Sequence, residues 1–72
     1  MTLDEVVRGA RIRILDIPDQ QARAQAIRFG ISVGSEVVCI EKIFTGPIVL
    51  SRSKQEIAIG RQLARRIQVE LI

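Results

Sequence analysis

The chain has 72 residues, which is enough for one small domain over residues 1–72 with a modest hydrophobic core. Histidine is absent and cysteine occurs once, so the chain lacks the commonest general base, the commonest metal ligand and any internal disulfide. The net charge of +3 fits ordinary solubility or attraction to an acidic surface. Composition therefore argues against an enzyme or a dedicated metal site within one chain, and no cofactor is expected.

Targeting signals and membrane segments are not apparent in the sequence. The N-terminus carries acidic residues where a secretory signal would be basic, and no apolar run has the length of a membrane helix. We therefore expect a cytoplasmic protein without membrane insertion. The lone Cys39 fits a reducing compartment, and its apolar neighbours predict a small buried hydrophobe rather than a reactive thiol.

The first elements expected along the chain are a helical turn and a strand. Thr2 and Glu5 have the spacing of a capping box, which opens a short helical turn. Residues 10–17 alternate between apolar and other side chains, so they predict a half-buried strand. Arg11 and Arg13 are expected on its outer face.

A helix is predicted over residues 20–29, with Asp19 as its N-cap. Gly30 stands where a left-handed glycine commonly ends a helix, and Gly34 suits a turn that needs positive φ. The apolar face expected for this helix consists of Ala22, Ala26 and Ile27.

The second half of the chain is predicted to be mainly β. Residues 35–44 are the longest strand candidate, apolar on both faces at their centre, and Gly46 belongs to the turn that ends them. Ser53 and Lys54 fit a two-residue hairpin turn, although they lack the usual Asn-Gly pair. The other expected elements are strands over 48–52, 55–59 and 67–71 and a helical turn over 60–65.

Five short strands with one inserted helix predict a mainly β fold with small helices. We expect a small, partly closed barrel, because closure removes the exposed edges that a flat sheet of this size would have.

The order of the motifs along the chain resembles the FeoA family, the small cytoplasmic proteins of bacterial ferrous iron uptake. The motifs are Phe29-Gly30-Ile31-Ser32-Val33-Gly34, Gly46-Pro47-Ile48, Ile57-Ala58-Ile59, Ala64 and Ile67-Gln68-Val69. The match spans nearly the whole chain. The resemblance implies an SH3-like β-barrel and a partner, the FeoB membrane transporter with its cytoplasmic guanine-nucleotide-binding domain.

The sequence departs from the family pattern at four positions. Phe29 replaces the usual aliphatic residue, and Val33 replaces a proline, and both changes conserve the fold. Gly60 stands where the family has a basic residue, so that Arg61 is displaced by one, and Leu63 stands where an acid is common. These two departures fall in the region where the arginines of the C-terminal half gather.

Two groups of residues are candidates for binding a partner. The first is the strand that is apolar on both faces, whose second face either packs into the core or forms an interface. The second is the arginine cluster around the C-terminal helical turn, which is either a solvated surface or a docking patch for an acidic partner. The candidate partner-binding residues are Val38, Ile40, Phe44, Pro47, Arg61, Arg65 and Arg66, and Ile43 belongs to the same apolar segment.

Three functions remain open at this point. The first is a non-enzymatic accessory protein that binds the FeoB cytoplasmic domain, with an arginine supplied in trans to GTP hydrolysis as one variant of it. The second is a nucleic-acid-binding barrel or the SH3-like module of an iron-dependent regulator, although two aromatic residues give little for stacking bases and no direct nucleic-acid binding is expected. The third is a peptide-binding or self-associating barrel, which would form a homo-oligomer through its second and third strands.

Overall fold

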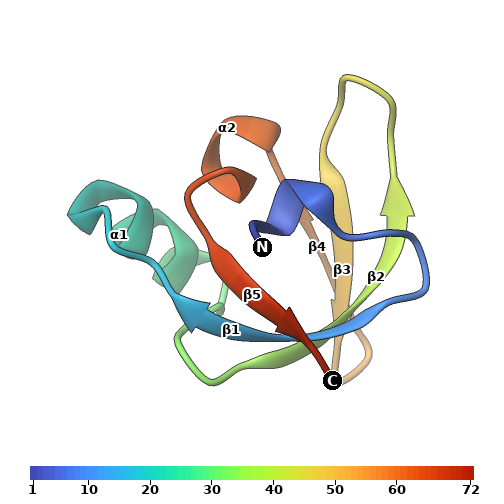
Figure 1. Cartoon of the computed structure of the whole chain (residues 1–72), viewed down its shortest axis with the longest axis horizontal. Coiled ribbons are helices and arrows are strands. Elements are labelled where there is room, and N and C mark those ends of the chain that lie inside the picture. The colour runs from blue at the N-terminus through green and yellow to red at the C-terminus, as the bar shows by residue number, and fades with distance from the viewer.

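Five strands and three short helical segments make up the protein, and the computed structural model describes all of residues 1–72. The elements in chain order are η1 (Leu3–Glu5), β1 (Arg11–Asp16), α1 (Gln20–Arg28), β2 (Glu36–Lys42), β3 (Ile48–Arg52), β4 (Gln55–Ile59), α2 (Arg61–Ala64) and β5 (Gln68–Leu71) (Figure 1). Every predicted strand is present, and the predicted boundaries differ from the observed ones by at most two residues.

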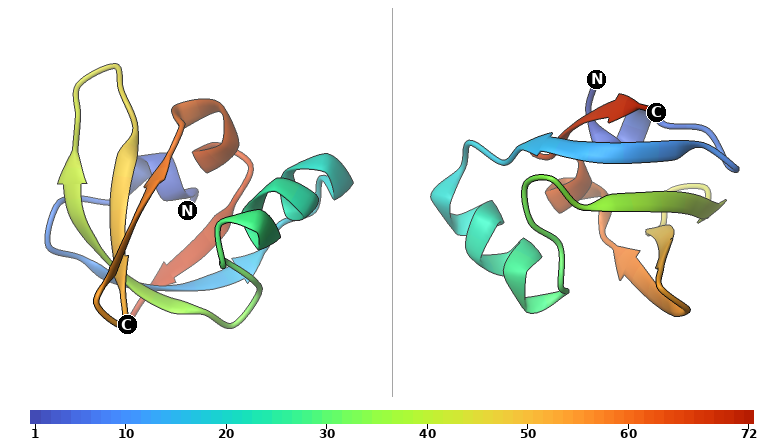
Figure 2. Two further views of the ribbon diagram at one scale, coloured as in Figure 1. Left: turned by 180° about the vertical axis from the view of Figure 1, so that it is seen from behind. Right: turned by 90° about the horizontal axis from the view of Figure 1, so that it is seen from below.

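The strands form a single antiparallel sheet in the order β4-β3-β2-β1-β5. The sheet curls, the N-terminal turn and α2 lie at its open side, and α1 projects beside it (Figure 2). The edge strands β4 and β5 do not pair, so the barrel is not closed by hydrogen bonds. The N-terminal residues lie along β5 instead, where the Val69 amide donates to the Met1 carbonyl at 2.8 Å. The prediction of a mainly β, five-stranded fold is confirmed.

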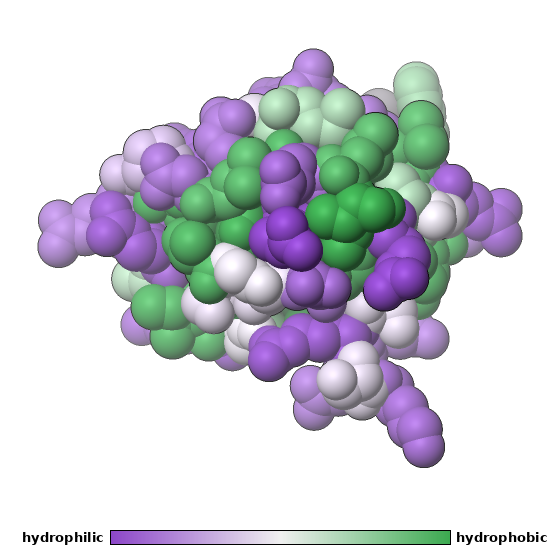
Figure 3. All heavy atoms as spheres, turned by 60° about the horizontal axis from the view of Figure 1, so that its bottom comes forward, coloured by the Kyte–Doolittle hydropathy of each residue, from purple (hydrophilic) through white to green (hydrophobic).

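The outer side of the sheet is of mixed polarity. On β1, Arg11 and Arg13 alternate with the buried Ile12 and Ile14, so both arginines are on the outer face as predicted. Arg13 lies opposite Glu36 of β2. Figure 3 shows green apolar atoms interrupted by purple hydrophilic ones over this part of the molecule. No continuous apolar surface covers β1 and β2 there.

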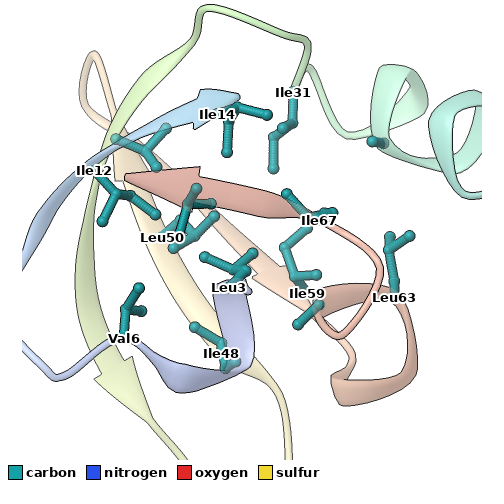
Figure 4. Close-up of a cluster of buried hydrophobic side chains, with 14 of the residues drawn as sticks. Leu3, Val6, Ile12, Ile14, Ile31, Ile48, Leu50, Ile59, Leu63 and Ile67 are labelled. Atoms are coloured by element: carbon teal, nitrogen blue, oxygen red, sulfur yellow. The ribbon is translucent and has the colours of Figure 1, made fainter. Parts of the chain in front are cut away.

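The inner side of the sheet encloses a core of 17 buried residues, all of them apolar side chains or Cys39. Leu3 of η1 lies among Ile48, Leu50 and Ile59 (Figure 4). Strand β1 contributes alternate residues to this core, because successive side chains of a strand point to opposite faces. The short N-terminal turn therefore fills the space that the curled sheet leaves open.

Helix α1 packs through a narrower stripe than the sequence predicts. Ala22 and Ala26 are buried, whereas Ile27 is 62% exposed. Ala22 and Ala26 are four residues apart and lie on one side of the helix, while Ile27 is rotated by about 100° from Ala26. The prediction that Ile27 belongs to the packed face is therefore wrong.

The caps of α1 agree with the sequence. The Asp19 carboxylate accepts hydrogen bonds from the Gln21 amide at 2.8 Å and the Ala22 amide at 3.3 Å. Gly30 has φ of 80°, and the Ile31 amide returns to the Ala26 carbonyl at 2.9 Å. A left-handed residue after the helix thus turns the chain so that Ile31 enters the core.

Strand β2 ends earlier than predicted. Its register with β3 shifts between Cys39 and Glu41, and the strand stops at Lys42. A bulge places an extra residue on one strand and bends it. Pairing resumes at Glu41 and Lys42, and Ile43 and Phe44 then lie in the β2–β3 connection instead of continuing the strand.

Candidate partner-docking surface

Helix α2 lies between α1 and the tip of the β2–β3 hairpin, as Figures 1 and 2 show from opposite sides. Leu63 and Ala64 anchor this four-residue helix in the core. Arg61 is half-buried, and Gln62 and the following Arg65 are exposed. The helix therefore presents polar and basic side chains between two projecting parts of the molecule.

A shallow hollow of about 440 Å³ lies on the hairpin side of α2, lined by Phe44, Thr45, Arg61, Gln62 and Arg65. We call it the Phe44 hollow. The Phe44 side chain is 90% exposed, which is unusual for a residue whose burial stabilises a fold by about 1.5–3 kcal/mol. An exposed aromatic ring beside basic side chains is a feature of protein interfaces, where Phe and Arg are enriched.

Arg61 connects the two sides of this hollow. Its Nη2 atom donates to the Ile43 carbonyl at 3.1 Å and so ties α2 to the hairpin tip. Its Nε atom is buried and has no hydrogen-bond partner. Arg61 takes part in no ion pair, although a guanidinium group offers five donors.

A second hollow, of about 400 Å³, lies on the α1 side of α2, and we call it the Phe29 hollow. Phe29 is 46% exposed here. The lining residues are Gln25, Arg28, Phe29, Gly60, Gln62 and Leu63. Gln62 belongs to both hollows, so the two form one surface, which we call the α2 face. This second hollow was not predicted from the sequence, although an aromatic residue beside an arginine at the end of the predicted helix is a signal for it.

The α2 face carries positive charge without acidic residues in its lining. Arg28, Arg61 and Arg65 supply the charge. The nearest carboxylate contact is between Arg65 Nε and Asp4 Oδ2, at 4.0 Å. An exposed ion pair of this length contributes little, so Arg65 keeps most of its capacity to bind an anionic group.

The structure divides the seven predicted partner-binding residues into separate places. It brings Phe44, Arg61 and Arg65 together in one hollow. Arg66 lies elsewhere, because its Nη1 atom pairs with Asp19 Oδ2 at 2.7 Å at the start of α1. The other three, Val38, Ile40 and Pro47, are half-buried, and Val38 lines a smaller hollow of about 210 Å³ on the outer face of the sheet.

The three glycines predicted to be structural are needed for two different reasons, backbone conformation and space. Gly30 and Gly34 have φ of 80° and 93°, values that favour glycine. At Gly46 a Cβ atom would lie 2.8 Å from a methyl carbon of Ile43, so the demand there is space within the hairpin tip.

The fold does not bring together side chains suited to nucleophilic or metal-binding chemistry. Cys39 is fully buried, and burial raises the pKa of its thiol, which disfavours the thiolate. No group of three His, Cys, Asp or Glu side chains comes close enough to hold a metal ion. None of the helices has the length and apolar character needed to cross a membrane.

The curled five-stranded sheet with a short helix before its last strand is an SH3-like domain. Residues 1–71 match the model of the FeoA domain, and the chain belongs to the FeoA family. Family membership supports a role in ferrous iron transport as a small accessory domain. No match to a curated protein reaches significance.

Solved structures support the same assignment. The crystal structure of an iron uptake regulatory protein, FeoA, is 27% identical and superimposes with a TM-score of 0.89 over all of this chain and 96% of that one. A FeoA-like protein from Clostridium acetobutylicum gives 0.88 at 23% identity, over all of this chain and 86% of that one. The regulator ScaR with bound Zn²⁺ gives 0.87 at 23% identity, but this chain spans 37% of it. The last two likenesses concern the fold alone.

Proposed function

We propose that this chain is a non-enzymatic accessory protein of ferrous iron transport that docks on the cytoplasmic domain of a FeoB-type transporter through its α2 face. The role in ferrous iron transport follows from the family. The partner and the surface are the proposed parts.

The observation that carries the proposal is the exposure of Phe44 beside Arg61 and Arg65. A small domain gains stability by burying its aromatic residues, so a chain with two of them that leaves both exposed around α2 presents binding surface. Interface energy concentrates in aromatic and arginine residues at such places.

The experiment is isothermal titration calorimetry of the chain with the cytoplasmic domain of its cognate transporter. We expect Phe44→Ser to weaken binding by about tenfold or more, because truncating an interface anchor costs more than about 1 kcal/mol. The matched control is Val33→Ser, which removes another exposed apolar side chain at the turn between α1 and β2.

Equal losses of affinity in the two variants would show that general surface hydrophobicity drives association. Unchanged affinity in Phe44→Ser would remove the α2 face from the interface. Absence of binding by the unsubstituted chain would contradict the proposed partner.

A further inference from the structure

We infer that the Phe44 hollow receives an acidic segment of the partner protein, with an Asp or Glu side chain between Arg61 and Arg65 and an apolar neighbour against the Phe44 ring. This inference rests on the proposed docking function and adds the chemistry of the segment that docks. It follows from the two arginines that line the hollow without a close acidic partner, from the hydrogen bonding of Arg61 and from the position of Phe44 beside them.

The positive charge in the hollow has no close acidic partner, and most of the other arginines of the chain likewise form no ion pair. Arg13 is paired with both Glu36 and Glu70, and Arg66 is paired with Asp19. Arg61 has no acidic partner, and the single contact of Arg65 is the 4.0 Å one to Asp4. Positive charge without an internal counterpart attracts carboxylate groups, and it opposes partners that carry further positive charge.

Arg61 is held ready for such a group. Its bond to the Ile43 carbonyl fixes the guanidinium against the hairpin tip, so binding a carboxylate there costs little side-chain entropy. Its Nη1 atom makes no hydrogen bond within the chain, so this donor is left for a carboxylate, whereas the unpartnered Nε atom is buried. Hydrogen bonds from arginine to a carboxylate are stronger than those between neutral groups.

Phe44 supplies the apolar half of the site. Its ring lines the same hollow as both arginines and is almost fully exposed. An apolar side chain next to the acidic residue of the partner would cover the ring and exclude water from the ion pair. Exclusion of water strengthens the attraction between the charges.

A peptide pair tests this chemistry directly. One probe is the N-acetylated, C-amidated peptide Leu-Glu-Asp-Leu-Glu, and its counterpart is Leu-Gln-Asn-Leu-Gln with the same blocked ends. Amide and arginine Nε–H signals of the ¹⁵N-labelled chain are recorded at low ionic strength. We expect the acidic peptide to shift the signals of Thr45, Arg61 and Arg65 at least fivefold more than the neutral one.

Charge reversal provides the matched control. Arg65→Glu is the preferred variant, because Arg65 is 66% exposed and makes no bond that holds the fold, whereas Arg61 also anchors the hairpin. We expect it to abolish the peptide shifts and to weaken binding of the transporter domain about tenfold. Lys54→Glu makes the same change of charge at the β3–β4 turn, at the opposite end of β3, and should leave both unchanged.

Equal shifts with the two peptides would mean apolar docking alone and would overturn the inference. Shifts at the hollow that depend on the concentration of the chain itself would assign it to a second copy and would also overturn it. If the transporter domain binds the unsubstituted chain and the Arg65→Glu variant equally, the inference fails while the proposed function stands. If the acidic peptide binds as expected and the transporter domain does not, the proposed partner fails while the carboxylate site stands.

Discussion

Arg13, Arg61 and Arg66 carry the same guanidinium group and differ in what surrounds it. Arg13 lies on the outer face of the sheet, where hydrogen bonds to Glu70 and then Glu36 raise its pKa. Because these two carboxylates already pair with it, Arg13 has few donors left for a partner protein. Arg66 is paired at the start of α1, whereas Arg61 has no carboxylate. The sequence shows that arginines cluster near the C-terminus, but their pairing depends on residues far along the chain, which the sequence pattern does not reveal.

Gly30 adopts a backbone conformation that favours glycine, whereas Gly60 adopts one that other residues also adopt. Gly30 has φ of 80°, whereas Gly60, the N-cap of α2, has φ of −61° and open space where a Cβ would lie. We expect Gly30→Ala to lower the free energy of unfolding by about 1–2 kcal/mol, because a Cβ atom strains the left-handed conformation. Gly60→Ala should change it by less than about 0.5 kcal/mol. Urea denaturation of both variants measures the difference, and equal losses would contradict this account.

Asp19 makes stability depend on pH at the acidic end. Hydrogen bonds from the Ala22 and Gln21 amides, and then the charge of Arg66, lower the pKa of its carboxyl group in the folded state. A lowered folded-state pKa adds stability above the unfolded-state pKa of about 3.9, and that stability is lost as pH falls through the folded-state value.

Asp19→Asn keeps a good N-cap without a titrating group, so its stability should fall less than that of the unsubstituted chain below about pH 4. Thermal unfolding followed between about pH 6 and 2.5 measures this difference. Parallel pH profiles for the two proteins would exclude Asp19 as a contributor.

At the scale of elements, the β3–β4 turn has two central residues of types that rarely adopt the positive φ found there. Ser53 and Lys54 have φ of 48° and 71°, and Arg52 pairs with Gln55 across the turn. Both central residues of a type I′ turn need positive φ, for which Asn-Gly is the preferred pair. The sequence predicted the hairpin from the strands on either side, and the structure confirms it.

Replacing Ser53-Lys54 with Asn-Gly should therefore raise the free energy of unfolding by about 0.5–2 kcal/mol. The control is Ser53→Ala, which leaves the backbone preference of the turn unimproved. The urea midpoint of the double variant is expected to rise with an unchanged slope. An unchanged midpoint would mean that the strain at these residues is negligible.

The positions of the elements were predictable because each has a local signal, such as the alternation over β1 or the Asp19 cap. The errors lie where tertiary contacts decide. Ile27 is apolar and suitably placed in sequence, yet α1 contacts the core only through its alanines. Strand β2 bulges between Cys39 and Glu41 and ends at Lys42, and no residue type before Ile43 predicts either feature.

At the scale of the whole molecule, stability depends on the single core inside the curled sheet. Leu50 is fully buried there, whereas Leu71 near the C-terminus is 59% exposed. We expect Leu50→Ala to cost about 2–5 kcal/mol, which is a large part of the stability of a small domain. Leu71→Ala should cost less than about 0.5 kcal/mol. Similar thermal midpoints for the two variants would contradict the assigned core.

The candidate site was only partly predictable from the sequence. Phe44, Arg61 and Arg65 were among the predicted partner-binding residues because of their type and local setting. Their convergence in one hollow depends on the path of the β2–β3 hairpin past α2. Phe29 and Arg28 were missed as members of the surface because the relation between α1 and α2 is set by packing and not by spacing along the chain.

Docking through the α2 face is best tested by an NMR titration of the ¹⁵N-labelled chain with the cytoplasmic domain of its cognate FeoB-type transporter. We expect shifts on the α2 face, strongest around Phe44 and Arg65, and none on the outer face of the sheet at Val38 and Val49. Shifts confined to that outer face, or a silent titration at high concentration, would contradict this expectation.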